Sequence, residues 1–219
     1  MKQTLIVEMG MIQKMKTTFT PATLLAASLL GTFCVWADHF IAIPEVNSVC
    51  TRRAMADSLT HGIVGLLTWA IVMYRLSTSK KRYALEVMVC GMAASALDVD
   101  HFIAAKSLHL KDALSLTSRP LLHSTTLILI IAMLLYLSLY LTPVKNNIRY
   151  TVPLLFLAAW LSHHVRDATR RGLWVWPYGS TSPIPYRIYI GIVAVLPFLW
   201  RFLIITCQGE MDRRDNEIV

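Results

Sequence analysis

The chain has 219 residues, of which 55% are hydrophobic and only 16% are charged, and its mean hydropathy is +0.52. Soluble domains carry about 25% charged residues, so this composition excludes a disordered chain and favours a compact protein whose main solvent is lipid. The net charge of +8 fits loops at a membrane surface, because no basic stripe is interleaved with stacking aromatic residues. We therefore expect the lipid bilayer as a partner and no nucleic acid.

Apolar segments recur along the chain, and each bilayer crossing needs about 20 mostly apolar residues. The candidate spans are Phe19–Ala37, Leu59–Leu76, Tyr83–Ala105, Leu121–Leu141, Tyr150–Val165 and Ile188–Cys207. The fifth is short, and aspartates interrupt the third near its end. Between the third and fourth spans, Ser107–Ser118 has apolar residues at helical spacing and is expected to form a short surface helix.

These spans predict an all-α fold, a polytopic membrane helical bundle of about six transmembrane helices. The bundle is expected to form one domain, residues 19–207, between a polar N-terminal segment (1–18) and a polar C-terminal tail (208–219). The first span could instead be a cleaved signal sequence, but its apolar stretch exceeds the usual length of about 7–15 residues. Lys14 and Lys16 before this span favour a cytoplasmic N-terminus.

The histidines and aspartates of the chain are unevenly distributed. If the six spans alternate through the membrane, every histidine lies on one side: His39, His61, His101, His109, His123, His163 and His164. The aspartates on that side are Asp38, Asp57, Asp98, Asp100, Asp112 and Asp167. Ionisable groups next to hydrocarbon are costly and usually face a bundle interior or a wet cavity, so this distribution predicts a shared polar site.

Several of these residues are four apart, a spacing that places both side chains on one helix face. The pairs are Asp57 with His61, Arg119 with His123, and His163 with Asp167, while Asp98, Asp100 and His101 share one turn. Imidazole and carboxylate ligands without thiolate suit zinc, manganese or iron(II). A bound divalent ion would lower the pKa of its water towards about 7, and Arg119 or Arg166 could hold a phosphate or carboxylate.

Each of these residues also has a purely structural interpretation. Asp57 could cap the second span, and His164 could be a packed ring that bonds a backbone carbonyl. Trp174 and Trp176 are typical interface anchors, and Gly172 is typical of a helix C-cap.

Several motifs resemble those of a known family. They are Asp98-Val99-Asp100-His101-Phe102, Arg119-Pro120-Leu121-Leu122-His123-Ser124, Ser162-His163-His164-Val165-Arg166-Asp167, Gly172-Leu173-Trp174 and Pro177-Tyr178-Gly179. With these motifs the chain resembles the transmembrane protein 267 family from about Leu30 to about Leu196. This resemblance implies a multi-pass membrane protein with no established activity.

A more distant resemblance is to bacterial inner-membrane proteins of the YdjM type, which are described as metal-dependent hydrolases. The residues that match its motifs are Asp98, Asp100 and His101, then Arg119, His123 and Ser124, then Ser162, His163 and Asp167. His61 resembles the histidine of its N-terminal Thr-His. Ser118 stands where that group has a further histidine, so one ligand is missing and an ion could bind here without catalysis.

The leading hypothesis is a metal-dependent hydrolase at one membrane face, acting on a lipid or another amphiphile. The expected ligands of a zinc or manganese ion are His61, Asp100, His101, His123, His163 and Asp167. The expected catalytic residues are Asp57 and Asp98, as general base or orienting groups, and Arg119. The alternatives are a transporter, although no inverted repeat is visible, and a non-enzymatic membrane scaffold whose polar residues only form hydrogen bonds.

Overall fold

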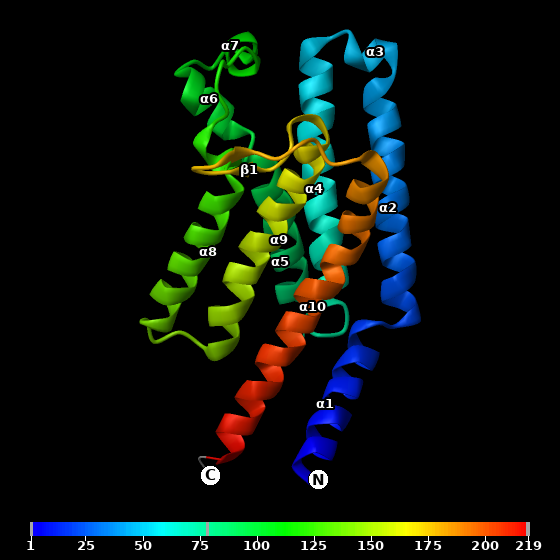
Figure 1. The fold of residues 1–219 in the computed structure, drawn as a ribbon, viewed down its shortest axis with the longest axis vertical. Coiled ribbons are helices and arrows are strands. Elements are labelled where there is room, and N and C mark those ends of the chain that lie inside the picture. Colours follow the sequence, from blue (N-terminus) through cyan, green and yellow to red (C-terminus); the bar gives the residue numbers. More distant parts are fainter. Residues whose placement is uncertain (1, 78, 218–219) are drawn as a thin grey trace.

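The computed structural model describes residues 2–77 and 79–217, with side chains described for residues 10–77 and 79–209. It is a helical bundle with one small hairpin (Figure 1). The longer helices are α1 (Lys2–Thr18), α2 (Pro21–Ala42), α4 (Cys50–Met73), α5 (Lys80–Ala96), α8 (Thr125–Tyr140), α9 (Asn146–Arg171) and α10 (Tyr186–Glu217). The short elements are α3 (Pro44–Asn47), α6 (Val99–Ala105), α7 (Leu110–Leu114), the 3-10 turn η1 (Leu121–His123) and the antiparallel strands β1 (Trp174–Val175) and β2 (Gly179–Ser180).

The all-α fold is confirmed, but the count of about six membrane crossings is not. Among the described residues, four helical segments are long and apolar enough to cross a membrane: α2, α4, α5 together with α6, and α10. Helix α8 is apolar but has only 16 residues. Helix α9 has 26 residues and is polar because its buried side chains include Ser162, His163, His164 and Arg166.

Different helices lie at the two ends of the bundle. Figure 1 shows α1 and the last turns of α10 at one end, and α3, α6 and α7 at the other. The short helix expected within 107–118 forms as α7. The chain that follows 208 continues α10 as far as Glu217, while the side chains of the tail beyond Gly209 lie outside the described part.

Helices α4 and α5 pack closely because glycines lie at their interface. A Cβ atom at Gly65 would lie 2.7 Å from the Cβ of Ala94, and one at Gly91 would lie 2.9 Å from the carbonyl oxygen of Gly62. Small residues allow this close backbone approach between membrane helices. The approach brings His61, next to Gly62 on α4, towards the end of α5.

Helix α9 is the central helix of the bundle and packs against α4, α5, α8 and α10. It ends at Gly172, whose φ of 70° is in the left-handed region and whose N–H donates to the Ala168 carbonyl at 3.0 Å. A Cβ atom at Gly172 would lie 1.9 Å from the carbonyl oxygen of Thr181, so only glycine fits here. The expected C-cap is present, and it turns the chain into the β1–β2 hairpin.

Candidate metal centre

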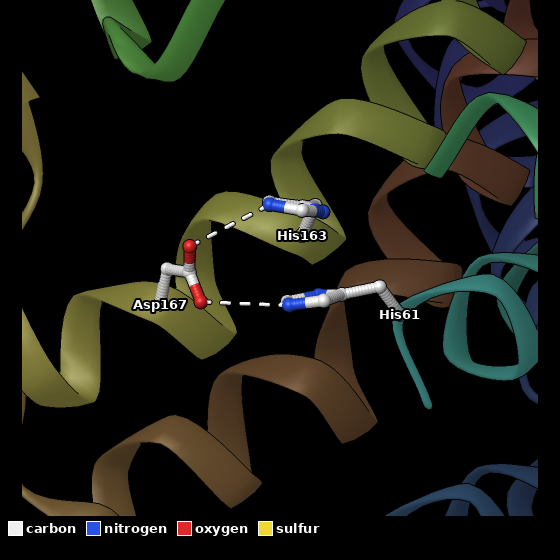
Figure 2. Close-up of side chains that lie close together, drawn as sticks. All are labelled: His61, His163 and Asp167. Atoms are coloured by element: carbon white, nitrogen blue, oxygen red, sulfur yellow. Dashed lines mark ion pairs between the residues drawn. The ribbon is translucent and has the colours of Figure 1, made fainter. Parts of the chain in front are cut away.

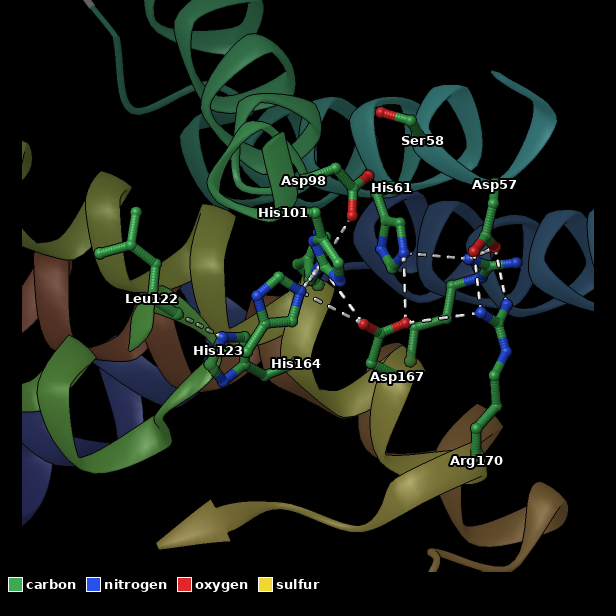
Figure 3. A network of polar contacts seen from close by, with 12 residues as sticks. Asp57, Ser58, His61, Asp98, His101, Leu122, His123, His164, Asp167 and Arg170 are labelled. Atoms are coloured by element: carbon green, nitrogen blue, oxygen red, sulfur yellow. Dashed lines mark hydrogen bonds and ion pairs between the residues drawn. The ribbon is translucent and has the colours of Figure 1, made fainter. Parts of the chain in front are cut away.

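Five histidines gather where α9 ends, and we call them the histidine cluster (Figure 3). They are His61 from α4, His101 from α6, His123 from η1, and His163 and His164 from α9. The ring centroids of His61 and His163 are 3.7 Å apart, and those of His123 and His163 are 5.2 Å apart. The other two histidines lie outside the cluster, His39 in the last turn of α2 and His109 just before α7.

Figure 2 shows His163 and Asp167 on successive turns of α9, with His61 approaching from α4. Asp167 contacts both rings, because its Oδ2 lies 3.5 Å from His163 Nε2 and its Oδ1 lies 3.4 Å from His61 Nε2. The four-residue spacing therefore places both α9 side chains on one face, as the sequence predicts.

Four polar atoms converge at α9, two of them from α9 itself, one from η1 and one from the segment between α5 and α6. His123 Nε2 lies 3.3 Å from His163 Nε2 and 3.6 Å from Asp167 Oδ2, and Asp98 Oδ1 lies 3.6 Å from His163 Nε2. These separations are long for hydrogen bonds between nitrogen and oxygen, which measure about 2.7–3.2 Å. Ligands bound tetrahedrally at about 2.0–2.1 Å from a zinc ion lie about 3.3–3.4 Å from one another. The spacing therefore fits ligands around an ion.

The hydrogen-bond partners of Nδ1 in His163 and His123 determine which nitrogen of each ring carries the hydrogen. His163 Nδ1 lies 2.9 Å from the Ala94 carbonyl oxygen, and His123 Nδ1 lies 3.1 Å from Asp100 Oδ2. Both partners accept hydrogen bonds, so each Nδ1 carries a hydrogen, and in the neutral rings each Nε2 presents a lone pair. Two lone pairs 3.3 Å apart repel unless a cation lies between them. Histidines that bind metals are held in this way by a carbonyl or a carboxylate.

The charges around the histidine cluster also favour a cation. Three carboxylates surround it, those of Asp98, Asp100 and Asp167. Among the described residues, their only basic partner besides histidine is Arg170, whose Nη1 lies 3.9 Å from Asp167 Oδ1. Asp100 Oδ1 and Asp167 Oδ1 are buried without a hydrogen-bond partner. The nearest partners of these oxygens are histidines, which balance a carboxylate only when they are protonated. Because burying a charge that is not balanced is costly, a divalent cation would offset this negative charge.

Asp57 lies in a separate ion-pair network. Arg170 donates to both of its oxygens, at 2.7 and 2.8 Å, and Arg166 also donates to it. Arg166 donates in addition to Asp38 Oδ1 at 2.9 Å, and its side chain is 2% exposed. This network leaves Arg166 buried and paired rather than facing a substrate. The pairing of α2 with α9 through Asp38 was not apparent from the sequence, since no spacing rule links residues 128 positions apart.

The remaining predicted residues surround the convergent atoms. His101 Nδ1 lies 3.1 Å from Asp100 Oδ1, beside the ring of His123. The Nε2 atom of His61 faces both Asp167 and Arg166, the latter at 3.2 Å. His164 donates from Nε2 to the Leu122 carbonyl at 3.1 Å, and its Nδ1 lies 3.2 Å from Thr125 Oγ1. His164 is therefore the packed ring of the structural interpretation.

One interpretation from spacing is wrong. Arg119 and His123 do not share a helix face, because Arg119 precedes the extended Pro120 and His123 lies in η1. Proline disfavours the helical conformation of the residue before it, so the helix α8 begins only after His123. Arg119 instead donates from Nη1 to the Gly172 carbonyl at 3.1 Å.

A cavity of about 670 Å³ opens beside the centre. Its polar wall includes Asp57, Asp98, His101, His123, His164 and Asp167, together with Arg53, Arg119, Arg170 and Arg171. Its apolar wall includes Met55, Val99, Phe102, Leu110, Leu114 and Trp174. Arg171 was not singled out as a binding residue from the sequence, although it follows Arg170 directly, because nothing there shows which residue of a basic turn faces a cavity.

The fold and the centre define an all-α membrane protein with converging histidines and carboxylates at one end of its bundle. The chain belongs to the YdjM inner membrane protein family, whose model matches residues 55–218. All of the converging atoms lie within that range.

Similar proteins are named transmembrane protein 267. The chain is 40% identical over 195 residues to the one from Danio rerio, which covers 89% of this chain and 86% of the relative. It is 38% identical over 181 residues to the one from Mus musculus, covering 83% of this chain and 82% of the relative. No solved structure matches. Both resemblances indicated by the motifs are confirmed, and the protein is a membrane protein.

Proposed function

We propose that the protein is a metal-dependent hydrolase that acts at a membrane face on an amphiphilic substrate. The observation that carries this proposal is the convergence of His123 Nε2, His163 Nε2 and Asp167 Oδ2, which lie 3.3–3.6 Å from one another. These three residues would hold a zinc or manganese ion, since both ions accept imidazole and carboxylate ligands. Three protein ligands with one position left over are typical of catalytic zinc sites.

The proposed chemistry is the addition of water across an ester or phosphoester bond. When bound, the ion supplies Lewis acidity towards a carbonyl or phosphoryl oxygen. Asp98, whose side chain is 32% exposed and lines the cavity, takes a proton from the attacking water. The oxygen of that water joins the acyl or phosphoryl group, and the leaving oxygen receives a proton.

The other predicted residues would hold the proposed metal ligands in position. Asp100 holds the ring of His123, with His101 beside it. His61 stacks on His163 and contacts the second oxygen of Asp167. Asp57 holds Arg166 and Arg170 in place behind them. In this assignment His61, Asp57, Asp100 and His101 are positioning residues.

Metal analysis of the purified protein tests the proposal. The protein in detergent, dialysed against zinc or manganese, should retain about one ion per chain, as expected for a single three-ligand site. The variant with His163→Ala and Asp167→Ala should lose it, because two of the three ligands are gone. His109→Ala, an exposed histidine outside the cluster, is the matched control and should keep the ion.

Two results would count against the proposal. A folded protein that retains neither ion would remove the metal centre and leave the scaffold alternative. A protein that holds the ion but cleaves no ester or phosphoester in mixed micelles would retain the centre and remove the catalytic role.

A further inference from the structure

Two arginines, Arg119 and Arg171, line the same cavity, and among the described residues neither forms an ion pair with a carboxylate. Arg119 enters from the segment before η1, and Arg171 is the last residue of α9. Burial, and then repulsion from Arg171, lower the pKa of Arg119. Arg171 is exposed, and among the described residues it has no ion pair. Like charges held together repel, so this pair is arranged to receive an anion.

Of the other two arginines that line this cavity, Arg170 is paired with a carboxylate, whereas Arg53 has no ion pair among the described residues. Arg170 donates two hydrogen bonds to Asp57. The buried Arg166, which does not line this cavity, is paired with Asp57 and Asp38. Arg53, Arg119 and Arg171 therefore remain to bind a ligand, and Arg119 also donates one hydrogen bond to the Gly172 carbonyl. Guanidinium groups present their donors as a planar fork that matches the oxygens of a phosphate.

The same cavity has an apolar wall that a free anion would not use. Met55, Val99 and Leu114 line it and are 68%, 53% and 50% exposed. Beyond the cavity, Leu108 and Tyr178 are 92% and 90% exposed on the α6–α7 connection and the β1–β2 hairpin. Large exposed apolar side chains that gather around a cavity favour contact with a membrane or an apolar ligand. The cavity thus suits an anionic headgroup joined to a hydrocarbon chain.

We infer that the ligand of this cavity is a lipid whose headgroup is a phosphate monoester. This inference rests on the proposed function and names its substrate. A phosphate monoester carries a charge of about −1.5 to −2 at neutral pH, which matches the two guanidinium groups, and its acyl chains would lie along the apolar wall. In the proposed hydrolysis water supplies an oxygen to phosphorus and the bond from phosphorus to the lipid oxygen breaks. The lipid oxygen takes up one of the protons of that water and leaves as an alcohol.

Binding of a short-chain phosphatidate to the protein after chelator treatment tests the inference without requiring a metal. Isothermal titration should show saturable binding to the wild type. Arg171→Gln should weaken it about tenfold through the loss of one charge-assisted contact. Arg171→Lys should have a smaller effect, because the charge remains. Arg187→Gln, an exposed arginine that does not line the cavity, should bind as the wild type does.

The comparison ligands separate the possible sources of the phosphate. Short-chain phosphatidylglycerol, an anionic diester, and inorganic phosphate should both bind at least about tenfold more weakly than phosphatidate. Equal binding of either, or unchanged binding by Arg171→Gln, would overturn the inference. Phosphatidate binding that depends on Arg171, in a protein that cleaves no phosphoester when loaded with zinc or manganese, would support the lipid site and overturn the proposed hydrolase.

Discussion

At the scale of single residues, the hydrogen-bond partners of the two ring nitrogens decide whether a histidine has a nitrogen left to bind a metal ion. His163 and His164 are adjacent in sequence, yet His163 has its Nδ1 on the Ala94 carbonyl and an Nε2 that faces His123 and Asp167. His164 has partners at both nitrogens. The sequence predicts that these histidines belong to a polar site, but it cannot show which nitrogen is free, because the partners come from other elements.

The contact between Asp100 and His123 gives a residue-scale prediction. Asp100→Asn removes the negative charge that makes the His123 ring a stronger ligand, while it retains an oxygen that can accept the Nδ1 hydrogen. We expect metal affinity to fall about 10–100-fold, as measured by competition with a chelating dye.

The control for this prediction is Asp112→Asn. Asp112 is exposed and accepts a hydrogen bond from Ser107 at 2.6 Å, and it lies outside the centre. If Asp100→Asn and Asp112→Asn bind metal as tightly as each other, Asp100 does not position a ligand.

At the scale of elements, the centre depends on how helices end and approach one another. Periodicity and apolar length predict the helices themselves, and the spacing within α9 predicts the His163–Asp167 pair. The sequence does not predict that the third apolar segment breaks between Ala96 and Val99, nor that a 3-10 turn holds His123. Both features depend on contacts between elements, which local propensity does not contain.

The close packing of α4 on α5 gives a prediction at this scale. Gly65→Ala places a methyl group 2.7 Å from the Cβ of Ala94, so one helix has to shift. We expect a loss of about 1–3 kcal/mol in the free energy of unfolding, the usual cost of overpacking, seen as a lower melting temperature in detergent. Metal affinity should fall as well, because the Ala94 carbonyl holds His163.

Gly191→Ala is the matched control, since a Cβ atom there meets nothing within 4 Å. Alanine is a better helix former than glycine by about 0.5–1 kcal/mol, so this variant should be as stable as the wild type or slightly more stable. Equal melting temperatures for the two alanine variants would show that the glycine contact does not limit the approach of α4 and α5.

At the scale of the whole molecule, the bundle gathers ionisable groups from distant parts of the chain at one end. Five of the seven histidines lie together near the end of α9, whereas His39 in α2 and His109 before α7 lie outside this cluster. The predicted count of about six spans is not confirmed, because α8 is short and α9 carries polar side chains that face the interior. The polar side chains that α9 contributes to the centre are also the ones that lower its hydropathy.

Metal removal tests how far the centre holds these elements together. The proposed ligands come from η1 and α9, and Asp98 lies between α5 and α6. An ion would therefore add a link between elements that are already joined by packing and by hydrogen bonds from His163 and His164. A ligand that binds only the folded state stabilises it by about 2.7 kcal/mol at a free concentration 100 times its Kd. For a chain of this size that corresponds to an increase of about 5–10 °C in melting temperature.

Chelator treatment should therefore lower the melting temperature of the wild type and of His109→Ala, and added zinc or manganese should restore it. The variant with His163→Ala and Asp167→Ala should melt at one temperature under all of these conditions, and a chelator-dependent shift in that variant would place the bound ion elsewhere in the protein.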